Sequence, residues 1–177
     1  ALDQSLSDKF NAAAEVISNT EGKVIFLGLG KSGHVAKKCA ATFSSLGIPS
    51  FFVHASEAFH GDFGMIDSYD TIIAFSFSSK TSEVVNAVKI CNKNNVSTIG
   101  ISGDSNSHLA KECQIHLDIC VNDEADHLNL APTSSTTNMM ALCDALASSI
   151  SEEKGISRSD FHTFHPGGSL GNQLEDE

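Results

Sequence analysis

Basic side chains are scarce in this sequence, which has 11 lysines and arginines against 22 aspartates and glutamates and a formal net charge of −11. A charge of this sign repels nucleic acid phosphates and anionic lipid headgroups, and no local basic patch offsets it. We therefore expect neither a nucleic acid nor a membrane as a partner. A small phosphate ester remains compatible, because backbone N–H groups, helix N-termini and one or two placed cations can bind it.

Long apolar runs and paired-cysteine motifs are also missing. No run approaches the ~20 residues that cross a bilayer, and the first ten residues do not form a signal peptide. The cysteines are odd in number, show no CxxC spacing, and each falls in an apolar or amphipathic segment. We therefore expect a cytoplasmic protein with reduced thiols in its core at Cys39, Cys91, Cys113, Cys120 and Cys143.

Short apolar runs rich in β-branched residues, bounded by glycine or polar turns, predict buried strands at residues 24–27, 50–53, 71–75, 97–101 and 115–119. Segments with helical spacing lie between them. Such alternation implies right-handed crossovers and a parallel sheet covered on both faces, as the nearly continuous apolar strands also indicate. The prediction is an α/β fold, a flavodoxin-like three-layer αβα sandwich with a five-stranded parallel sheet, in one domain over residues 1–177.

Two further helices frame this pattern. An amphipathic helix precedes the first strand, and a long helix runs from about Thr133 to Lys154 with an apolar stripe that includes Met139 and Cys143. The other face of the long helix is rich in alanine, serine and threonine, which suits close helix–helix packing between subunits.

The loop after the first strand, Gly28–His34, is rich in glycine. Gly28, Gly30 and Gly33 match the GxGxxG dinucleotide pattern, but the second strand ends in His54 and lacks the supporting acid. Three interpretations stay open: a nucleotide loop, a tight turn with an exposed lysine, or a site in which Lys31 pairs with a phosphate or a developing oxyanion.

The loop after the third strand, residues 76–83, carries hydroxyl groups at a strand end and opens a helix capped by Thr81 or Ser79. Hydroxyls and free helical N–H groups can cradle a phosphate without net positive charge. The alternative is an ordinary serine-rich helix cap. Glu83 is then either a carboxylate that complements the helix dipole or an acid or base of a site.

The loop after the fifth strand, residues 121–132, contains Glu124 and is followed by the hydroxyl-rich start of the long helix. A carboxylate in this position can serve as a general base, although an acidic surface loop fits the same residues. Ligands of open parallel sheets bind at the carboxyl ends of the strands, near the switch in strand order. We therefore expect these three loops to form the site.

Eight histidines are many for this length, and four of them lie near candidate segments: His54, His60, His162 and His165. No spacing typical of a zinc site occurs, so proton transfer near neutral pH is the favoured interpretation over a catalytic metal.

Five separated segments occur in this order: residues 28–54 (GLGKSGHVAKKCAATFSSLGIPSFFVH), 57–66 (EAFHGDFGMI), 76–83 (S-x-S-x-x-x-S-E), 130–137 (LAPTSSTT) and 165–171 (HPGGSLG). Together they make the chain resemble the arabinose-5-phosphate isomerases of the SIS (sugar isomerase) domain family. The resemblance implies conversion of ribulose 5-phosphate to arabinose 5-phosphate, the precursor of the Kdo sugar of lipopolysaccharide, without a cofactor. It also implies a homotetramer whose sites are shared between subunits.

The residues that match the family's catalytic positions are Lys31, Glu83, Glu124 and His165. Moving a carbonyl from C2 to C1 through a cis-enediol needs a base for a C–H proton, an acid, and support for the enediolate. On this hypothesis Glu124 or His165 takes the carbon proton, Lys31 supports the oxyanion, and Glu83 shuttles protons together with His60.

Residues that match substrate contacts in the family lie in all of these segments: Ser32, Gly47, Ile48, His60, Ser76, Ser78, Thr81, Ser134 and Ser135. The family's metal-sensitive histidine aligns with His54, where a bound metal is expected to inhibit.

The chain departs from the family pattern in two places. The third loop has Phe77, Ser79 and Lys80 where asparagine, glycine and glutamate are usual, and the usual Cys-Pro near Asp126-His127 is missing. We expect a single SIS domain without the CBS domains that many members carry, either as an SIS-only form or as a fragment of a longer protein. Two rival functions stay open: a non-catalytic SIS module that binds a sugar phosphate and signals to a partner, and an isomerase of another phosphosugar such as a hexulose phosphate or sedoheptulose 7-phosphate.

Overall fold

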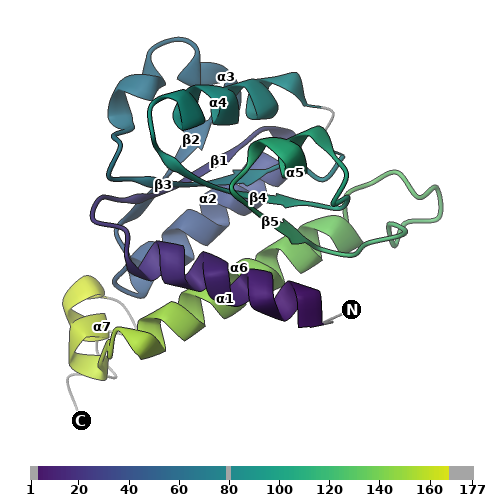
Figure 1. Cartoon of the computed structure of the whole chain (residues 1–177). Coiled ribbons are helices and arrows are strands. Elements are labelled where there is room, and N and C mark those ends of the chain that lie inside the picture. The colour runs from purple at the N-terminus through teal and green to yellow at the C-terminus, as the bar shows by residue number, and fades with distance from the viewer. Residues whose placement is uncertain (1–3, 79–80, 168–177) are drawn as a thin grey trace.

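The computed structural model describes residues 4–78 and 81–167. Its centre is a sheet of parallel strands in the order β2-β1-β3-β4-β5 (Figure 1). The predicted strands and their parallel pairing are confirmed, because each bound lies within one residue of the prediction. The strands are β1 (Val24–Gly28), β2 (Ser50–His54), β3 (Thr71–Phe75), β4 (Ser97–Ser102) and β5 (Ile115–Asp118).

Helices cover both faces of this sheet (Figure 1), which confirms the three-layer sandwich. None of the helices in the described ranges is long and apolar enough to span a membrane. One face carries α1 (Gln4–Ser18), α2 (Gly30–Ser45) and α6 (Ser134–Glu153). The other face carries α3 (Ala55–Ala58), α4 (Ser82–Lys93) and α5 (His108–Glu112). The 3-10 helix η1 (Asp62–Met65) follows α3, and α7 (Arg158–Phe164) follows α6.

The core has two halves because successive residues of a strand point to opposite faces of the sheet. Phe26 and Ile73 pack under α1, α2 and α6, whereas Ile25 and Ile72 pack under α3, α4 and α5. All four side chains have no exposed surface. The apolar residues on both faces explain why β1 and β3 are continuous apolar runs in the sequence.

Strand β2 is less buried than the sequence pattern predicts. Only Val53 is buried, and the other four residues of the strand are half-buried. The expectation of burial on both faces is wrong for this strand, because β2 lies at the edge of the sheet with β1 as its single neighbour.

The cysteines are all free thiols but do not all lie in the core. Cys39, Cys91 and Cys143 are buried, and burial raises the pKa of Cys91 to about 11. Cys113 is half-buried, and burial together with the charge of Glu112 raises its pKa to about 12. Cys120 is exposed and has a φ of 50°, so the expectation of a core position is wrong for this residue.

Helix α7 is absent from the predicted elements, although the sequence signals its start. Ser157 Oγ accepts a hydrogen bond from the backbone N–H of Asp160 at 3.1 Å, and the Asp160 carboxylate accepts one from the N–H of Ser157 at 2.9 Å. The hydrogen bonds from Ser157 lower the pKa of Asp160. This is a capping box at a Ser-x-x-Asp spacing, and the short helix that it opens positions His165.

A buried histidine lies on the outer strand β5. His116 is 6% exposed, its Nε2 lies 2.7 Å from Ser102 Oγ, and its Nδ1 has no hydrogen-bond partner among the described residues. Burial lowers the pKa of His116, the charge of Lys9 adds to this, and the charges of Asp118 and Asp104 act against it. His116 is therefore neutral in the folded chain at pH values where an unfolded histidine is protonated.

We expect the folded chain to lose stability as the pH falls below about 6.5, the ordinary pKa of histidine. Below that pH the unfolded chain binds a proton that buried His116 does not, so the free energy of unfolding falls by up to about 1.4 kcal/mol per pH unit. Above that pH the full contribution is present. Urea unfolding at about pH 7 and about pH 5.5 measures this loss before most carboxylates titrate.

The comparison variants are His116→Asn and, as a control, His108→Asn at an exposed position. His116→Asn should flatten the pH dependence, whereas His108→Asn should leave it as in the wild type. An equal pH dependence in the wild type and His116→Asn would contradict the assignment.

Candidate functional site

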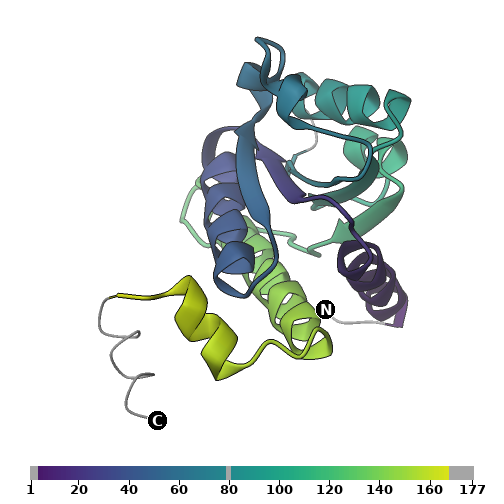
Figure 2. The same ribbon diagram turned by 90° about the vertical axis from the view of Figure 1, so that its left-hand side faces the viewer.

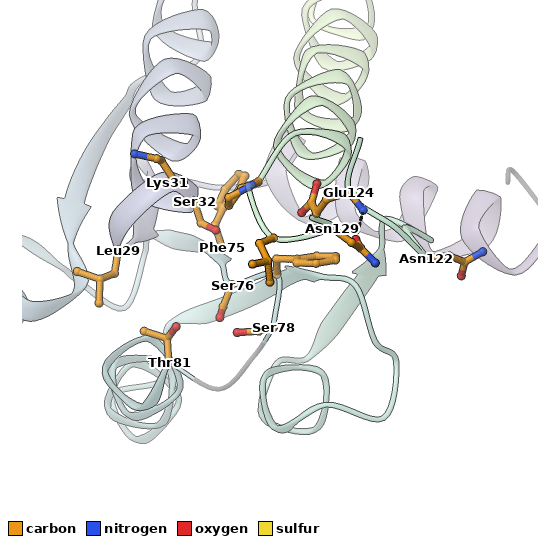
Figure 3. A pocket seen from close by; sticks show the side chains of 13 residues that line it. Leu29, Lys31, Ser32, Phe75, Ser76, Ser78, Thr81, Asn122, Glu124 and Asn129 are labelled. Carbon is orange, nitrogen blue, oxygen red and sulfur yellow. Dashed lines mark hydrogen bonds between the residues drawn. The ribbon is translucent and has the colours of Figure 1, made fainter. Parts of the chain in front are cut away.

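A cavity of about 520 Å³ opens at the carboxyl edge of the sheet (Figure 3). The loops after β1, β3 and β5 line it, so the three loops that are expected to form the site meet at one cavity. Strand β1 lies between β2 and β3, so the strand order switches here, where open parallel sheets bind ligands. The lining residues are Leu29, Lys31, Ser32, Phe75, Ser76, Phe77, Ser78, Thr81, Asn122, Glu124, Asn129, Leu130 and Pro132.

The glycine-rich segment after β1 is a tight junction between a strand and a helix. Helix α2 begins at Gly30, which has a φ of 60°, so Leu29 alone separates it from β1. A Cβ on Gly28 would lie 3.0 Å from the Cα of Gly33, so both glycines permit the close approach of helix and strand. The junction places Lys31 and Ser32 in the first turn of α2, beside the cavity.

Lys31 and Ser32 stand on the α2 side of the cavity, and Glu124 stands on the α6 side (Figure 3). The Lys31 side chain is exposed, and its amino group is directed away from the Glu124 carboxylate (Figure 3). The structure therefore brings Lys31 to the cavity wall without an ion pair between these two groups.

Hydroxyl groups line the opposite wall, as the sequence predicts. Ser76, Ser78 and Thr81 border the cavity (Figure 3), and Thr81 is the N-cap of α4 although its side chain makes no capping hydrogen bond. Its hydroxyl is therefore not committed to the helix end. The alternative cap Ser79 and the added cation Lys80 lie outside the described residues.

Glu83 lies in the first turn of α4 and is half-buried. Its Oε2 accepts a hydrogen bond from Ser82 Oγ at 3.1 Å. Glu83 is next to the hydroxyl wall but is not one of the residues that line the cavity.

The Glu124 carboxylate is held at the N-terminus of α6. Its Oε2 accepts hydrogen bonds from Thr133 N at 2.8 Å, Thr133 Oγ1 at 3.1 Å and Ser135 N at 3.1 Å, and its Oε1 accepts one from Ser135 Oγ. Desolvation raises the pKa of Glu124, but the hydrogen bonds from Ser135 and Thr133 outweigh it, so that the pKa lies below its ordinary value. Glu124 is therefore ionised at neutral pH.

This arrangement also locates two predicted substrate contacts. Ser135 is buried and its hydroxyl donates to Glu124, while Ser134 is the first residue of α6 and is half-buried. Neither residue lines the cavity. Ser135 thus touches the site through Glu124.

The loop between β5 and α6 is braced from within. Asn129 has a φ of 54°, in the left-handed region that asparagine tolerates. Its Oδ1 accepts from Glu124 N at 2.6 Å, and its Nδ2 donates to Asp123 Oδ1 at 2.8 Å. The carboxylate of Asp126 accepts from three backbone N–H groups further along the loop, at 3.0, 2.8 and 2.7 Å. These contacts fix the backbone that carries Glu124.

His165 lies far from this cavity within the same chain. Its Nδ1 is 2.9 Å from Phe161 O, its Nε2 is 3.3 Å from Ser45 Oγ, and its ring stacks on Phe161 at 4.0 Å between centroids. Ser45 is the last residue of α2 and Lys31 is in the first turn, so about 21 Å of helix separates them. Figures 1 and 2 show α7 beyond the last turn of α6, at the far end of the molecule from the loop before α6.

Gly47 and Ile48 share this far end with His165. Gly47 has a φ of 77°, and a Cβ there would lie 2.9 Å from the Phe164 ring. Ile48 is 2% exposed. The structure therefore divides the predicted site residues into two groups, one at the cavity and one around the α2–β2 turn and α7.

The two candidate histidines near β2 lie outside the cavity lining. His54 ends β2, its ring meets Phe52 edge to face, and its buried Nδ1 has no hydrogen-bond partner among the described residues. His60 is exposed in the turn after α3. Within residues 4–78 and 81–167, no group of three or more His, Cys, Asp or Glu side chains could hold a metal ion.

Several cavity residues are absent from the predicted site. The sequence offers a signal for two of them, because Phe75 ends a predicted strand and Asn129 is a residue type that adopts a positive φ. The others have no signal of their own, although all but Asn122 fall within the segments that carry the family resemblance: Leu29, Phe77, Asn122, Leu130 and Pro132.

The chain matches the model of the SIS domain family over residues 17–149. The arabinose 5-phosphate isomerase KdsD of Pseudomonas aeruginosa is 46% identical over 169 residues, which cover 96% of this chain and 52% of that protein. The arabinose 5-phosphate isomerase KdsD of Escherichia coli K12 is 44% identical over 173 residues, with coverage of 98% and 53%. The chain thus spans about half the length of the curated relatives it matches.

A solved structure is also similar over most of the chain. An Escherichia coli CFT073 protein in complex with arabinose 5-phosphate has a TM-score of 0.89 and 42% sequence identity, and the match covers 93% of this chain and 87% of that chain.

Proposed function

The chain belongs to the SIS domain family, and from this premise we propose that it interconverts D-ribulose 5-phosphate and D-arabinose 5-phosphate. The observation that carries the proposal is the cavity at the carboxyl edge of the sheet. It combines a carboxylate that is ionised at neutral pH, a lysine and a wall of hydroxyl groups. These are the groups that a cis-enediol isomerisation of a phosphorylated sugar needs.

The phosphate group is assigned to the wall formed by Ser76, Ser78 and Thr81. Hydroxyl groups and the first N–H groups of α4 can bind a dianion in a chain of net charge −11, because the helix N-terminus carries partial positive charge. The N-terminus of α6 is not available for this role, since the Glu124 carboxylate already occupies it.

Two residues are candidates for the base that takes the carbon proton. Glu124 is ionised, as a base must be, but four hydrogen bonds stabilise its charge and make it a weak base. His165 offers a better proton acceptor. A carbonyl oxygen can only accept, so Nδ1 carries the ring proton that is donated to Phe161 O, and Nε2 carries a lone pair that can take a proton. We assign the carbon proton to His165 and the orientation of the substrate hydroxyls to Glu124.

Further roles follow the family positions. Lys31 and Ser32 at the start of α2 support the enediolate oxygens, and the proton shuttle is assigned to Glu83 and His60. Ser135 acts on the sugar through Glu124, Ser134 is assigned to the sugar by its family position, and a metal bound at His54 inhibits.

The assignment to His165 requires a shared site, since this residue is about 20 Å from its own cavity. We propose a homotetramer in which the group around Gly47, Ile48 and His165 completes the cavity of a neighbouring subunit. Exposed small residues of α6 leave a helix face open for close packing between copies: Ala141, Ala145, Ser148 and Ser149.

We place the protein in the cytoplasm and its product in the synthesis of Kdo for lipopolysaccharide. The free thiols support the first part, because Cys39 and Cys143 interact in the core without forming a disulfide.

The direct test is a substrate panel in which ribulose 5-phosphate, a hexulose 6-phosphate and sedoheptulose 7-phosphate are each followed to their aldose. The proposal expects the largest kcat/KM for ribulose 5-phosphate. Turnover of a longer sugar alone would make the chain a different phosphosugar isomerase. Binding of the sugar phosphate without turnover of any of the three would favour a regulatory module.

Asn129→Gly is expected to lower kcat about tenfold, because removing the two hydrogen bonds of its side chain releases the backbone of Glu124, and a misplaced catalytic group is costly. Glycine keeps the left-handed backbone unstrained, so the melting temperature should change little. Asn95→Gly is the matched control, since Asn95 also has a positive φ, of 60°, but lies in the α4–β4 turn. An equal kcat in both variants would argue against the bracing role.

A further inference from the structure

Phe77 is the aromatic residue of the loop that follows β3, residues 76–83, which otherwise carries mostly hydroxyl groups. It lies between Ser76 and Ser78 and also lines the cavity. Phe77 lies on the same side of the sheet as Phe75. It packs against the half of the core under α1, α2 and α6. The ring therefore stands on the α6 side of the sheet, where the loop before α6 carries Glu124.

A glycine behind the ring fixes its position. Gly103 follows β4, and its N–H donates to Phe77 O at 3.2 Å. A Cβ on Gly103 would lie 2.8 Å from Phe77 Cδ2 and would clash with Phe77 Cε2. The ring thus rests directly on the Gly103 backbone, and a side chain at position 103 would push the ring toward the cavity.

We propose that Phe77, seated on Gly103, sets the length of the sugar chain that the cavity accepts. The proposal rests on the proposed function and names the residue that selects a five-carbon phosphosugar. Every added carbon of such a substrate carries a hydroxyl group. An aromatic ring cannot replace the hydrogen bonds that this hydroxyl makes to water, so a longer chain would leave it unpaired against Phe77.

The geometry gives the ring a place between the two ends of the substrate. Ser76 and Ser78 flank it on the wall assigned to the phosphate, and Glu124 lies on the side assigned to the reacting carbons. With the phosphate anchored, the position of the ring limits the distance over which the carbon chain can extend.

The first test compares kcat/KM for ribulose 5-phosphate and sedoheptulose 7-phosphate in the wild type and Phe77→Ala. The ratio should shift at least about tenfold toward the seven-carbon substrate, the scale at which pockets discriminate by size. Phe77→Leu keeps apolar packing and should shift the ratio in the same direction by less, which covers the case in which the alanine variant does not fold. A ratio within about twofold of the wild type in a folded variant would overturn the proposal.

The second test uses the glycine. Gly103→Ala should displace the ring into the cavity and lower kcat/KM for both substrates, with the greater loss for the longer one. In a Phe77→Ala background the same change should have little effect, because the ring that it displaces is gone. A Gly103→Ala effect that persists without the ring would assign Gly103 a separate structural role and contradict the pairing.

Calorimetry on the same variants also measures their affinities for the five- and seven-carbon sugar phosphates. These affinities distinguish a failure of the proposed function from a failure of the role of Phe77. If the wild type does not turn over ribulose 5-phosphate, the proposed function fails, whereas the affinity ratio still shows whether Phe77 selects by length. If turnover is normal and neither ratio changes, only the role of Phe77 is refuted.

Discussion

Lys31→Ala is expected to lower kcat for ribulose 5-phosphate by about 10²–10³-fold, the loss seen when one preorganised donor to an oxyanion is removed. The lysine sits in the first turn of α2 and is the cation contributed by the three loops that line the cavity in the described residues. Because the enediolate charge develops only during the reaction, kcat should fall much more than KM changes. Steady-state kinetics near neutral pH measure both.

The matched control is Lys37→Ala, which removes an exposed lysine further along the same helix. It changes the net charge by the same amount and does not touch the cavity lining. A similar loss in both variants would point to a long-range effect of charge, and normal turnover of Lys31→Ala would refute its role.

His165→Ala is expected to lower kcat by about 10²–10⁴-fold, the range for losing a proton-transfer group. Glu124→Gln is expected to lower kcat by about 10²-fold, because the substrate hydroxyls lose the group that orients them. Mixed tetramers should regain activity if one subunit supplies Glu124 and its neighbour supplies His165. With random assembly at equal amounts, half of the subunits carry an intact Glu124 and the other half an intact His165. About a quarter of the shared sites then combine both intact residues. Co-expression of the two variants with different affinity tags isolates the mixed assemblies.

The control for this experiment mixes Glu124→Gln with Lys31→Ala. Both residues line the same cavity of one chain, so no mixed assembly restores a complete site and activity should stay low. Recovery in this control, or none in the first mixture, would contradict a site shared between subunits.

Most of the fold could be predicted from the sequence because local and global preferences agree. The runs of β1 and β3 are apolar on both faces, and the glycine and polar turns that bound them leave little freedom in where the strands end. The strands' position in the sheet was harder to predict. Whether β2 is central or at the edge depends on strand order, which no local pattern encodes, so its half-exposed surface was missed.

For the candidate site, the sequence predicts which loops meet at the cavity better than it predicts the contacts between their side chains. Lys31, Ser76 and Glu124 follow strands that end at one edge of the sheet, and this alone brings them to one cavity. The link from Ser135 to Glu124 depends on the path of the loop between β5 and α6, as does the bracing by Asn129. Such loop geometry is not periodic, so the sequence pattern could not reveal it.

His165 shows the limit of motif-based assignment. Its motif matches a catalytic position, but hydrogen bonds to Phe161 and Ser45 hold the side chain at the far end of α2. A sequence motif can identify a residue, but it does not show in which subunit's cavity that residue acts. The spacing of residues in one chain carries no information on the symmetry of an assembly.

The most direct test of enediol isomerisation is the reaction of ribulose 5-phosphate in D₂O, followed by NMR of the product. Removal of a proton from C1 and its return at C2 passes through an acidic group that exchanges with solvent. Enediol isomerisation predicts arabinose 5-phosphate that carries deuterium at C2, and none of this product with His165→Ala on the same timescale. Absence of arabinose 5-phosphate, or its formation with only hydrogen at C2, would contradict the account.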